Sequence, residues 1–124
     1  MIAFTRYNNA TWEERIYTVR NDGTDLKKLT TEDNVQEHFP DFSPDGKKIV
    51  FAKMVKGGQF DVYVMNSDGS GRVNLTNTPN IREDMPAWSP DGQQIAFSLS
   101  NDIYVMAADG TKQTKLTSNT AFDW

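Results

Sequence analysis

The sequence predicts an all-β fold in which one short unit occurs three times. Three observations support this prediction. The same apolar triplet appears as Ile2-Ala3-Phe4, Ile49-Val50-Phe51 and Ile95-Ala96-Phe97. A second, tyrosine-containing segment follows each triplet, and an Asp-Gly pair begins five residues after each of these tyrosines. No stretch of the 124 residues shows the sustained period of about 3.6 residues that an amphipathic helix requires.

The other parts of the unit keep a fixed order along the chain. The tyrosine segments are 16–19, 62–65 and 103–106, and their Asp-Gly pairs lie at 22–23, 68–69 and 109–110. Seven residues beyond each of those aspartates is a Leu-Thr pair, at 29–30, 75–76 and 116–117. Two longer related stretches, 39–46 and 85–92, lie between the repeats and end in Ser-Pro-Asp-Gly. The apolar segments are about 4 to 6 residues long and rich in β-branched and aromatic side chains, which favours strands.

We interpret both kinds of Asp-Gly pair as hairpin turns. Proline sets the backbone angle φ for the start of a turn, and glycine adopts a positive φ without steric cost. The stretches 21–25 and 66–70 also resemble calcium-binding loops. If each glycine took the sixth position of an EF-hand loop, the first ligand would be Thr18, Val64 or Val105, and none of these is a carboxylate. The sequence therefore predicts turns rather than a metal site.

Four antiparallel strands repeated every 40 to 47 residues or so are typical of a β-propeller blade. With the strands named a to d from the centre outward, Phe42 and Trp88 lie on strand a, the triplets on b, the tyrosine segments on c, and the segments reaching the Leu-Thr pairs on d. One blade cannot cover both faces of its own sheet, so neighbouring blades must pack together. We predict a single partial propeller domain over 1–124, with repeats at approximately 1–38, 39–84 and 85–124 and a first blade that lacks its innermost strand.

The composition excludes several classes of function. The chain has no cysteine, and His38 is its single histidine, so disulfides, thiolate nucleophiles and sites with two imidazoles are excluded. A formal net charge of −4 argues against nucleic-acid binding, and no apolar run approaches the roughly 20 residues that cross a bilayer. A Gly-x-Ser-x-Gly elbow is absent. Acidic residues are plentiful enough for a paired-carboxylate glycosidase, but composition alone places no such pair, and we predict a non-enzymatic protein without cofactor or metal.

The third repeat carries a family resemblance. The run 86–92, the triplet 95–97, the segment 102–106, Asp109-Gly110 and Leu116-Thr117 resemble the WD-like repeat of the TolB carboxy-terminal propeller. This resemblance implies a six-bladed, non-catalytic scaffold that binds protein, with a cell-envelope lipoprotein as partner and a periplasmic or otherwise extracytoplasmic location. Related repeats also form gating domains attached to peptidases. The alternative function is therefore a substrate-gating propeller portion of a larger hydrolase or peptidase.

The end of the chain can be aligned with the earlier repeats in two ways. If Trp124 matches Trp88, the segment 120–124 donates a strand a. If Asp123-Trp124 matches Asp84-Met85, the alignment needs a smaller gap and the chain stops just short of strand a, as a fragment of a larger propeller would. The second alignment is the more economical. Both leave open sheet edges, which favour association, and we predict a homodimer. Under the first alignment, two copies would complete each other's open blade by strand exchange and close a six-bladed ring.

The loops between strands b and c differ between the repeats, whereas the Asp-Gly turns do not. These loops, at 7–14 and 56–60, and the d-to-a loops, at 31–38 and 77–84, should emerge on one rim of the propeller. Loops on a rigid scaffold commonly carry recognition. Ordinary loop variation and the packing of blade edges are the alternative explanations. The candidate residues of this partner-binding rim are Tyr7, Trp12, Glu37, His38, Phe60, Arg82 and Asp84.

Overall fold

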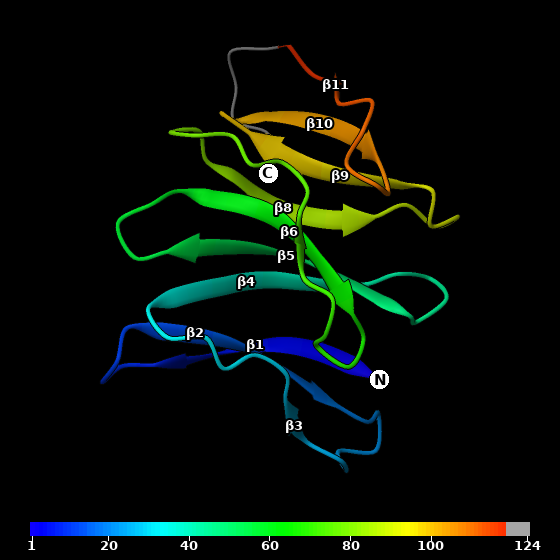
Figure 1. Cartoon of the computed structure of the whole chain (residues 1–124). Coiled ribbons are helices and arrows are strands. Elements are labelled where there is room, and N and C mark those ends of the chain that lie inside the picture. Colours follow the sequence, from blue (N-terminus) through cyan, green and yellow to red (C-terminus); the bar gives the residue numbers. More distant parts are fainter. Residues whose placement is uncertain (119–124) are drawn as a thin grey trace.

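Three antiparallel sheets follow one another along the chain in the computed structural model, which describes residues 1–118 (Figure 1). The first contains β1 (Ile2–Asn8), β2 (Glu13–Val19) and β3 (Lys27–Lys28). The second contains β4 (Val35–Phe42), β5 (Lys48–Val55), β6 (Phe60–Asn66) and β7 (Val73–Asn74). The third contains β8 (Glu83–Trp88), β9 (Gln94–Leu99), β10 (Asp102–Ala107) and β11 (Thr114–Lys115). The predicted all-β partial propeller is confirmed, and among residues 1–118 the first blade has strands b, c and d without strand a.

The outermost strand of each blade is shorter than the sequence predicts. Strands β3, β7 and β11 contain two residues each, and the Leu-Thr pair follows the strand instead of lying inside it. The threonine hydroxyl then accepts a hydrogen bond from a backbone N–H of strand c, 14 residues earlier. These bonds join Thr30 to Ile16 at 3.0 Å, Thr76 to Val62 at 3.0 Å and Thr117 to Ile103 at 2.9 Å. This threonine clasp explains why Leu-Thr occurs in every repeat.

The Asp-Gly pairs form the predicted turns. The glycines between strands c and d have φ values of 83°, 89° and 87° at Gly23, Gly69 and Gly110. Each preceding aspartate accepts hydrogen bonds from the N–H and hydroxyl of the residue two positions on. In the a-to-b turns, the hydroxyl of Ser43 or Ser89 donates to the aspartate two residues later, at 2.6 Å in both. The same turn chemistry therefore fixes every hairpin of this type.

The hydrophobic core lies between the sheets. At the first junction, between the first and second sheets, Ile16 packs with Ile49, Phe51 and Met65. At the second junction, between the second and third sheets, Val50 and Val62 pack with three side chains of the third sheet, Ile95, Phe97 and Met106. All of these residues are buried. Neighbouring blades therefore cover the apolar face that each sheet would otherwise expose.

The c-to-d turns approach the preceding blade closely. A Cβ atom added at Gly69 would lie 2.8 Å from the carbonyl oxygen of Leu29, and one added at Gly110 would lie 2.9 Å from that of Leu75. Both distances are shorter than real Cβ contacts. Glycine is therefore required at these two positions by the junctions as well as by the turn angle.

Strand a contains a β-bulge in both blades that have this strand. The pairing register shifts between His38 and Asp41 in β4 and between Asp84 and Ala87 in β8. Phe39 and Met85, just inside these shifts, both have a φ of 51°, which is unusual for bulky side chains. Bulges bend a strand and redirect the side chains beside them. They occur here immediately after His38 and Asp84, two of the predicted rim residues.

Candidate functional site

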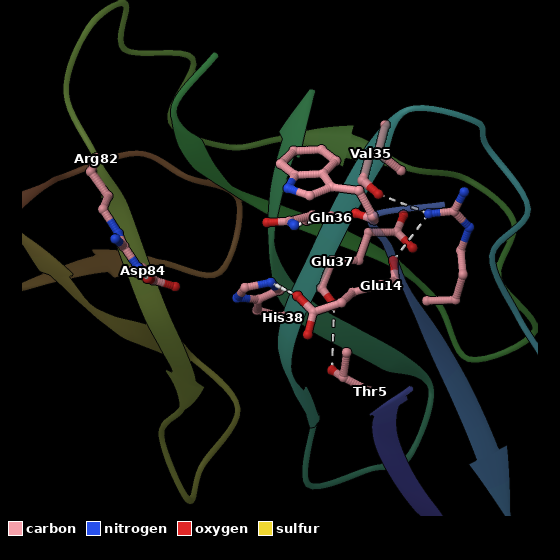
Figure 2. A network of polar contacts seen from close by, with 10 residues as sticks. Thr5, Glu14, Val35, Gln36, Glu37, His38, Arg82 and Asp84 are labelled. Atoms are coloured by element: carbon pink, nitrogen blue, oxygen red, sulfur yellow. Dashed lines mark hydrogen bonds and ion pairs between the residues drawn. The ribbon is translucent and has the colours of Figure 1, made fainter. Parts of the chain in front are cut away.

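The residue before each bulge makes an ionic contact with another charged side chain. His38, on β4 of the second sheet, contacts the carboxylate of Glu14, on β2 of the first sheet, through Nε2 (Figure 2). This contact is an ion pair only when the imidazole is protonated. At the equivalent position of β8, Asp84 accepts a hydrogen bond of 3.0 Å from Nε of Arg82. The two positions are thus polar in both blades, with different partners.

The ring of Phe60 connects these two polar groups. Its centroid lies 4.6 Å from that of the His38 ring, and the Arg82 guanidinium carbon lies 5.2 Å from the Phe60 centroid. Phe60 itself is buried. We define the inner-rim cluster as Glu14, His38, Phe60, Arg82 and Asp84. The cluster takes side chains from all three sheets or the loops that join them, with Phe60 between the two charged groups.

A hollow of about 250 Å³ adjoins the third-sheet end of the cluster, and it is lined by Arg82, Asp84, Met85, Ser98, Ser100 and Asn101. The side chain of Arg82 is 60% exposed, whereas that of its partner Asp84 is almost buried. Phe39, beside His38, has 44% of its surface exposed although it is a large apolar residue. The site therefore offers a cation and an aromatic face to the surroundings.

Glu37 differs from the other predicted rim residues because it is fully buried. Successive side chains of a strand point to opposite faces, and Glu37 lies inside while His38 takes part in the cluster. Within the described part of the chain, no group meets the geometry of a hydrogen bond to either of its carboxylate oxygens. Burial raises the pKa of Glu37, and four neighbours oppose this shift: the Thr30 hydroxyl and the charges of Arg72, Lys53 and Arg15. The structure removes Glu37 from the exposed rim and places it in the first junction.

Glu83 is the buried acid that sequence reasoning missed. It occupies the position of Glu37 one repeat later, six residues before the serine of Ser-Pro-Asp-Gly in both cases. Glu83 is also fully buried, and its carboxylate oxygens have no hydrogen-bond partner among residues 1–118. Burial raises the pKa of Glu83, the hydroxyls of Thr76 and Thr78 oppose the shift, and the nearby Asp61 adds to it. Aligning the two repeats on this serine would have shown that Glu83 and Glu37 occupy equivalent positions.

Trp12 and Tyr7 are the two predicted residues in the turn and strand of the first blade. Trp12 is in the turn between β1 and β2, where its carbonyl accepts a hydrogen bond of 3.3 Å from the side-chain amide of Gln36 on β4. Tyr7 is exposed on β1 and lines a separate hollow of about 260 Å³, together with Arg6, Asn8, Asn9, Glu13, Arg15, Tyr17 and Lys28. The structure therefore groups four of the predicted residues, His38, Phe60, Arg82 and Asp84, and leaves Tyr7 outside their group.

Most of the predicted rim residues lie on strands instead of loops. His38 and Asp84 were expected in the d-to-a loops, but β4 begins at Val35 and β8 at Glu83. Tyr7 and Phe60, expected in the b-to-c loops, lie on β1 and β6. Only Trp12 and Arg82 of the seven candidates are outside strands. The site is thus held mainly by paired backbone, which positions side chains more rigidly than a loop does.

Two further features are absent from the described residues, a cluster of metal ligands and a membrane-spanning helix. Among 1–118 there is no group of three or more histidine or acidic side chains placed to hold a metal ion. That same part of the chain contains no helix of the length and apolarity that spanning a membrane requires.

Comparison with solved structures supports the architecture. The chain is similar to a protein described as a TolB from Agrobacterium tumefaciens, with 21% identity, a TM-score of 0.80, and coverage of 92% of this chain and 44% of that one. It is also similar to TolB from Acinetobacter baumannii, with 22% identity, a TM-score of 0.78, and coverage of 97% and 30%. The tricorn protease matches at 23% identity and a TM-score of 0.64, over 88% and 10%. The chain thus spans less than half the length of each of these proteins.

The sequence itself provides the evidence of family. A search of curated proteins gives no significant match. The sequence model of one family, the N-terminal region of dipeptidyl peptidase IV (DPP IV), matches residues 43–123, from the first Ser-Pro-Asp-Gly turn to near the end of the chain. The similar structures confirm the predicted likeness to TolB propellers at the level of the fold. Because the family model covers well over half of the sequence, the chain belongs to the DPP IV N-terminal region family, with three blades of a β-propeller.

Proposed function

We propose that the chain is a non-catalytic propeller scaffold that binds a polypeptide partner through the inner-rim cluster. The observation that carries this proposal is the packing of two side chains against the ring of Phe60 on β6. They are His38, on β4 of the same sheet, and Arg82, in the segment before β8. Aromatic and arginine side chains are enriched among the residues that dominate binding energy at protein interfaces. The adjoining hollow gives a partner side chain a place to enter.

The exposed groups of the site indicate the chemistry of the partner. Arg82 presents an exposed guanidinium whose orientation is held by Asp84, and Phe39 presents an exposed ring. A guanidinium donates paired hydrogen bonds to a carboxylate, while an aromatic ring favours apolar contact. The best-matched partner segment therefore combines an acidic side chain with an apolar one. An extracytoplasmic location and a cell-envelope partner remain predictions from the resemblance to TolB.

The test is capture of partners by the immobilised chain from a cell-envelope fraction, followed by titration of the captured protein in a calorimeter. Arg82→Ala and Phe39→Ala should each weaken binding about 10-fold, the loss expected for one important interface side chain. Tyr7→Ala is the matched control because Tyr7 is an exposed aromatic residue beside a different hollow. Failure of the unmodified chain to capture any protein, or equal weakening by the control, would count against the proposal.

A second candidate function is a substrate-gating propeller portion of a larger peptidase or hydrolase. It is supported by membership in a family named after a dipeptidyl peptidase and by the similarity to the tricorn protease and to puromycin hydrolase, the latter at 17% identity and a TM-score of 0.67. The same capture experiment distinguishes the two. If the chain captured a peptidase domain and Arg82→Ala did not weaken that capture, gating would be favoured. The domain would then bind a surface other than the cluster.

A further inference from the structure

The second junction contains two neighbouring carboxylates, one of them buried without a partner. Glu83 is fully buried, and neither of its carboxylate oxygens has a hydrogen-bond partner among residues 1–118. The groups around it are the hydroxyls of Thr76 and Thr78 and the carboxylate of Asp61. A buried charge costs free energy unless an opposite charge or hydrogen bonds compensate it, and the second carboxylate adds to that cost.

A hollow of about 410 Å³ opens beside these carboxylates. Asp61 and Thr78 both line it, and so do Gln59 and Asn80. Glu83 lies behind Asp61 and Thr78, so its carboxylate is near the base of the hollow. The volume falls in the range of ~300 to 1,000 Å³ that is usual for small-ligand sites. Its walls come from the second sheet and from the segment that leads to the third sheet, in the interior of the chain.

The first junction has a guanidinium at the corresponding position. The repeats align without a gap from strand c to strand a, so that Arg15 is the counterpart of Asp61 and Glu37 is the counterpart of Glu83. Burial raises the pKa of Glu37, and the charge of Arg15 is among the groups that oppose this rise. The first junction thus supplies from its own sequence a cation that the second junction lacks at this position.

The acceptors that hold the Arg15 guanidinium have counterparts at the second junction. Nη1 of Arg15 donates to the carbonyl oxygens of Val35, at 2.9 Å, and Glu14, at 3.1 Å, and Nη2 lies 2.8 Å from the carboxylate of Glu13. In the same order, the aligned residues of the second repeat are Ile81, Phe60 and Gln59. Two of these positions need only a backbone carbonyl, and the Gln59 amide oxygen is also an acceptor.

The other two cations near the first buried glutamate are replaced as well. Lys53 and Leu99 are the cross-strand partners of the two glutamates. Arg72 and Gln113 are also equivalent, because each donates to the glycine carbonyl three residues earlier, at 3.3 Å and 3.4 Å. Asp, Leu and Gln therefore stand at the second junction where Arg, Lys and Arg surround the glutamate at the first, while the glutamate itself is kept.

We propose that the hollow at the second junction binds the guanidinium of an arginine side chain on another polypeptide segment, with Asp61 and Glu83 as its counter-charges. A guanidinium is planar and has five N–H donors in a fixed arrangement, which suits carboxylates and carbonyls together. A metal ion fits less well, since residues 1–118 contain no group of three acidic or histidine side chains placed to hold one. Neither carboxylate belongs to the inner-rim cluster, so this inference stands without the proposed function.

A heteronuclear NMR titration at pH 7 with the capped peptide acetyl-Ala-Arg-Ala-amide tests the proposal. The backbone amide signals of Gly57, Gly58 and Asn80, which line the hollow, should shift with a dissociation constant of about 1 mM. The peptide with citrulline, a neutral analogue of the same shape, should bind about 10-fold more weakly because it has no charge. The lysine peptide should also bind more weakly, since an ammonium cannot make the same set of hydrogen bonds.

Glu83→Gln and Glu37→Gln form a matched pair of variants. Glu83→Gln should weaken binding of the arginine peptide about 5-fold or more, because it removes one of the two counter-charges. Removing one of two neighbouring buried carboxylates should not destabilise the fold, so unfolding would not explain the loss. Glu37→Gln changes the same residue at the first junction, where Arg15 is already present, and should leave the dissociation constant unchanged.

Asp61→Arg supplies the missing guanidinium from the chain itself. It recreates the charge arrangement of the first junction, and should therefore raise the melting temperature and abolish binding of the peptide.

Four results would each overturn the proposal: equal binding of the citrulline or lysine peptide, equal weakening by the two glutamine variants, a lower melting temperature for Asp61→Arg, or signal shifts at the hollow with calcium chloride and none with the arginine peptide.

Discussion

The two junctions place the same residue, a buried glutamate on strand a, in opposite electrostatic surroundings. At the first junction Glu37 is near the positive charges of Arg72, Lys53 and Arg15, which partly offset the cost of its burial. At the second junction Glu83 is near the carboxylate of Asp61, which adds to that cost. Asp61 takes the place that Arg15 holds one repeat earlier, so a positive charge at this position is replaced by a negative one.

The cross-strand partners of the two glutamates differ in charge in the same way, with a positive partner only at the first junction. Glu37 is paired with Lys53 on β5, whereas Glu83 is paired with Leu99 on β9. Lys53 is itself buried and contacts Glu32 and the ring of Tyr63. The second junction instead has a polar contact of its own, in which the backbone N–H of Trp88 donates to Asp41 at 2.8 Å. The comparison teaches that the repeat conserves the shape of a junction while its charges vary.

The largest expected effect is loss of the aromatic side chain that fills each junction. Phe51→Ala and Phe97→Ala should each lower the free energy of unfolding by about 3 to 5 kcal/mol, because both rings are fully buried and leave a cavity. Phe4→Ala, at the equivalent position of the first blade, should cost clearly less because Phe4 is only partly buried. Chemical denaturation of the three variants measures the differences. Equal losses at all three positions would show that the internal junctions contribute little to stability.

The next effect concerns the turn glycines. Gly69→Ala and Gly110→Ala should each cost about 2 to 3 kcal/mol, since the new Cβ collides with a carbonyl oxygen of the neighbouring blade in addition to straining the turn. Gly57→Ala, where only the strain applies, should cost about 1 kcal/mol. Thermal unfolding of the three variants gives the comparison. A cost at Gly57 as large as that at Gly69 would mean that strain alone sets the requirement for glycine.

The smallest effect, and the one that sharpens the electrostatic comparison, is removal of the buried charges. Because burial raises the pKa of Glu83 in the folded chain, its contribution to stability is fully present below the unfolded value near 4.5 and is lost as the pH rises through the folded pKa. Glu83→Gln should therefore stabilise the protein at pH 7 by ~1 kcal/mol and have little effect at pH 4. Glu37→Gln should stabilise less, because its positive neighbours lose their counter-charge.

Denaturant titrations at pH 4, 5, 6 and 7 measure this difference. The unmodified chain should lose stability relative to Glu83→Gln across that range, and the loss should be smaller relative to Glu37→Gln. If Glu37→Gln stabilised the protein as much as Glu83→Gln does, the positive charges around Glu37 would have no effect on it. The comparison between the two junctions would then fail.

The repeat pattern was sufficient to predict the sheets, because each strand and turn is determined by local residues. Asp-Gly at a fixed distance from a tyrosine predicts a hairpin wherever it occurs, and the structure has one at each of the three positions. The pattern failed at 35–38, which was predicted as loop and forms the start of β4. Val35 and Glu37 both face inward, and an inward glutamate breaks the alternation by which a half-buried strand is recognised.

The candidate site could be predicted only in part for a related reason. Its residues were predicted because aromatic and charged side chains occur in the sequence near the connections between strands. Which of these side chains contact one another depends on the packing of one repeat against the next. The approach of Phe60 to Arg82 joins residues 22 positions apart across the second junction, and no local pattern encodes that distance. The bulges after His38 and Asp84, which redirect strand a, also have no separate signal beyond the Pro at 40 and 86.

The threonine clasp has a consequence for how the chain acquires its structure. Each clasp joins two residues of one repeat, 14 positions apart, and needs nothing from the neighbouring blade. Once Thr30 has been synthesised and has left the ribosome, both residues of the first clasp are available to form their hydrogen bond. During synthesis from the amino terminus, the strand pairings can therefore form one blade at a time. Each completed blade then offers the apolar face against which the next blade packs.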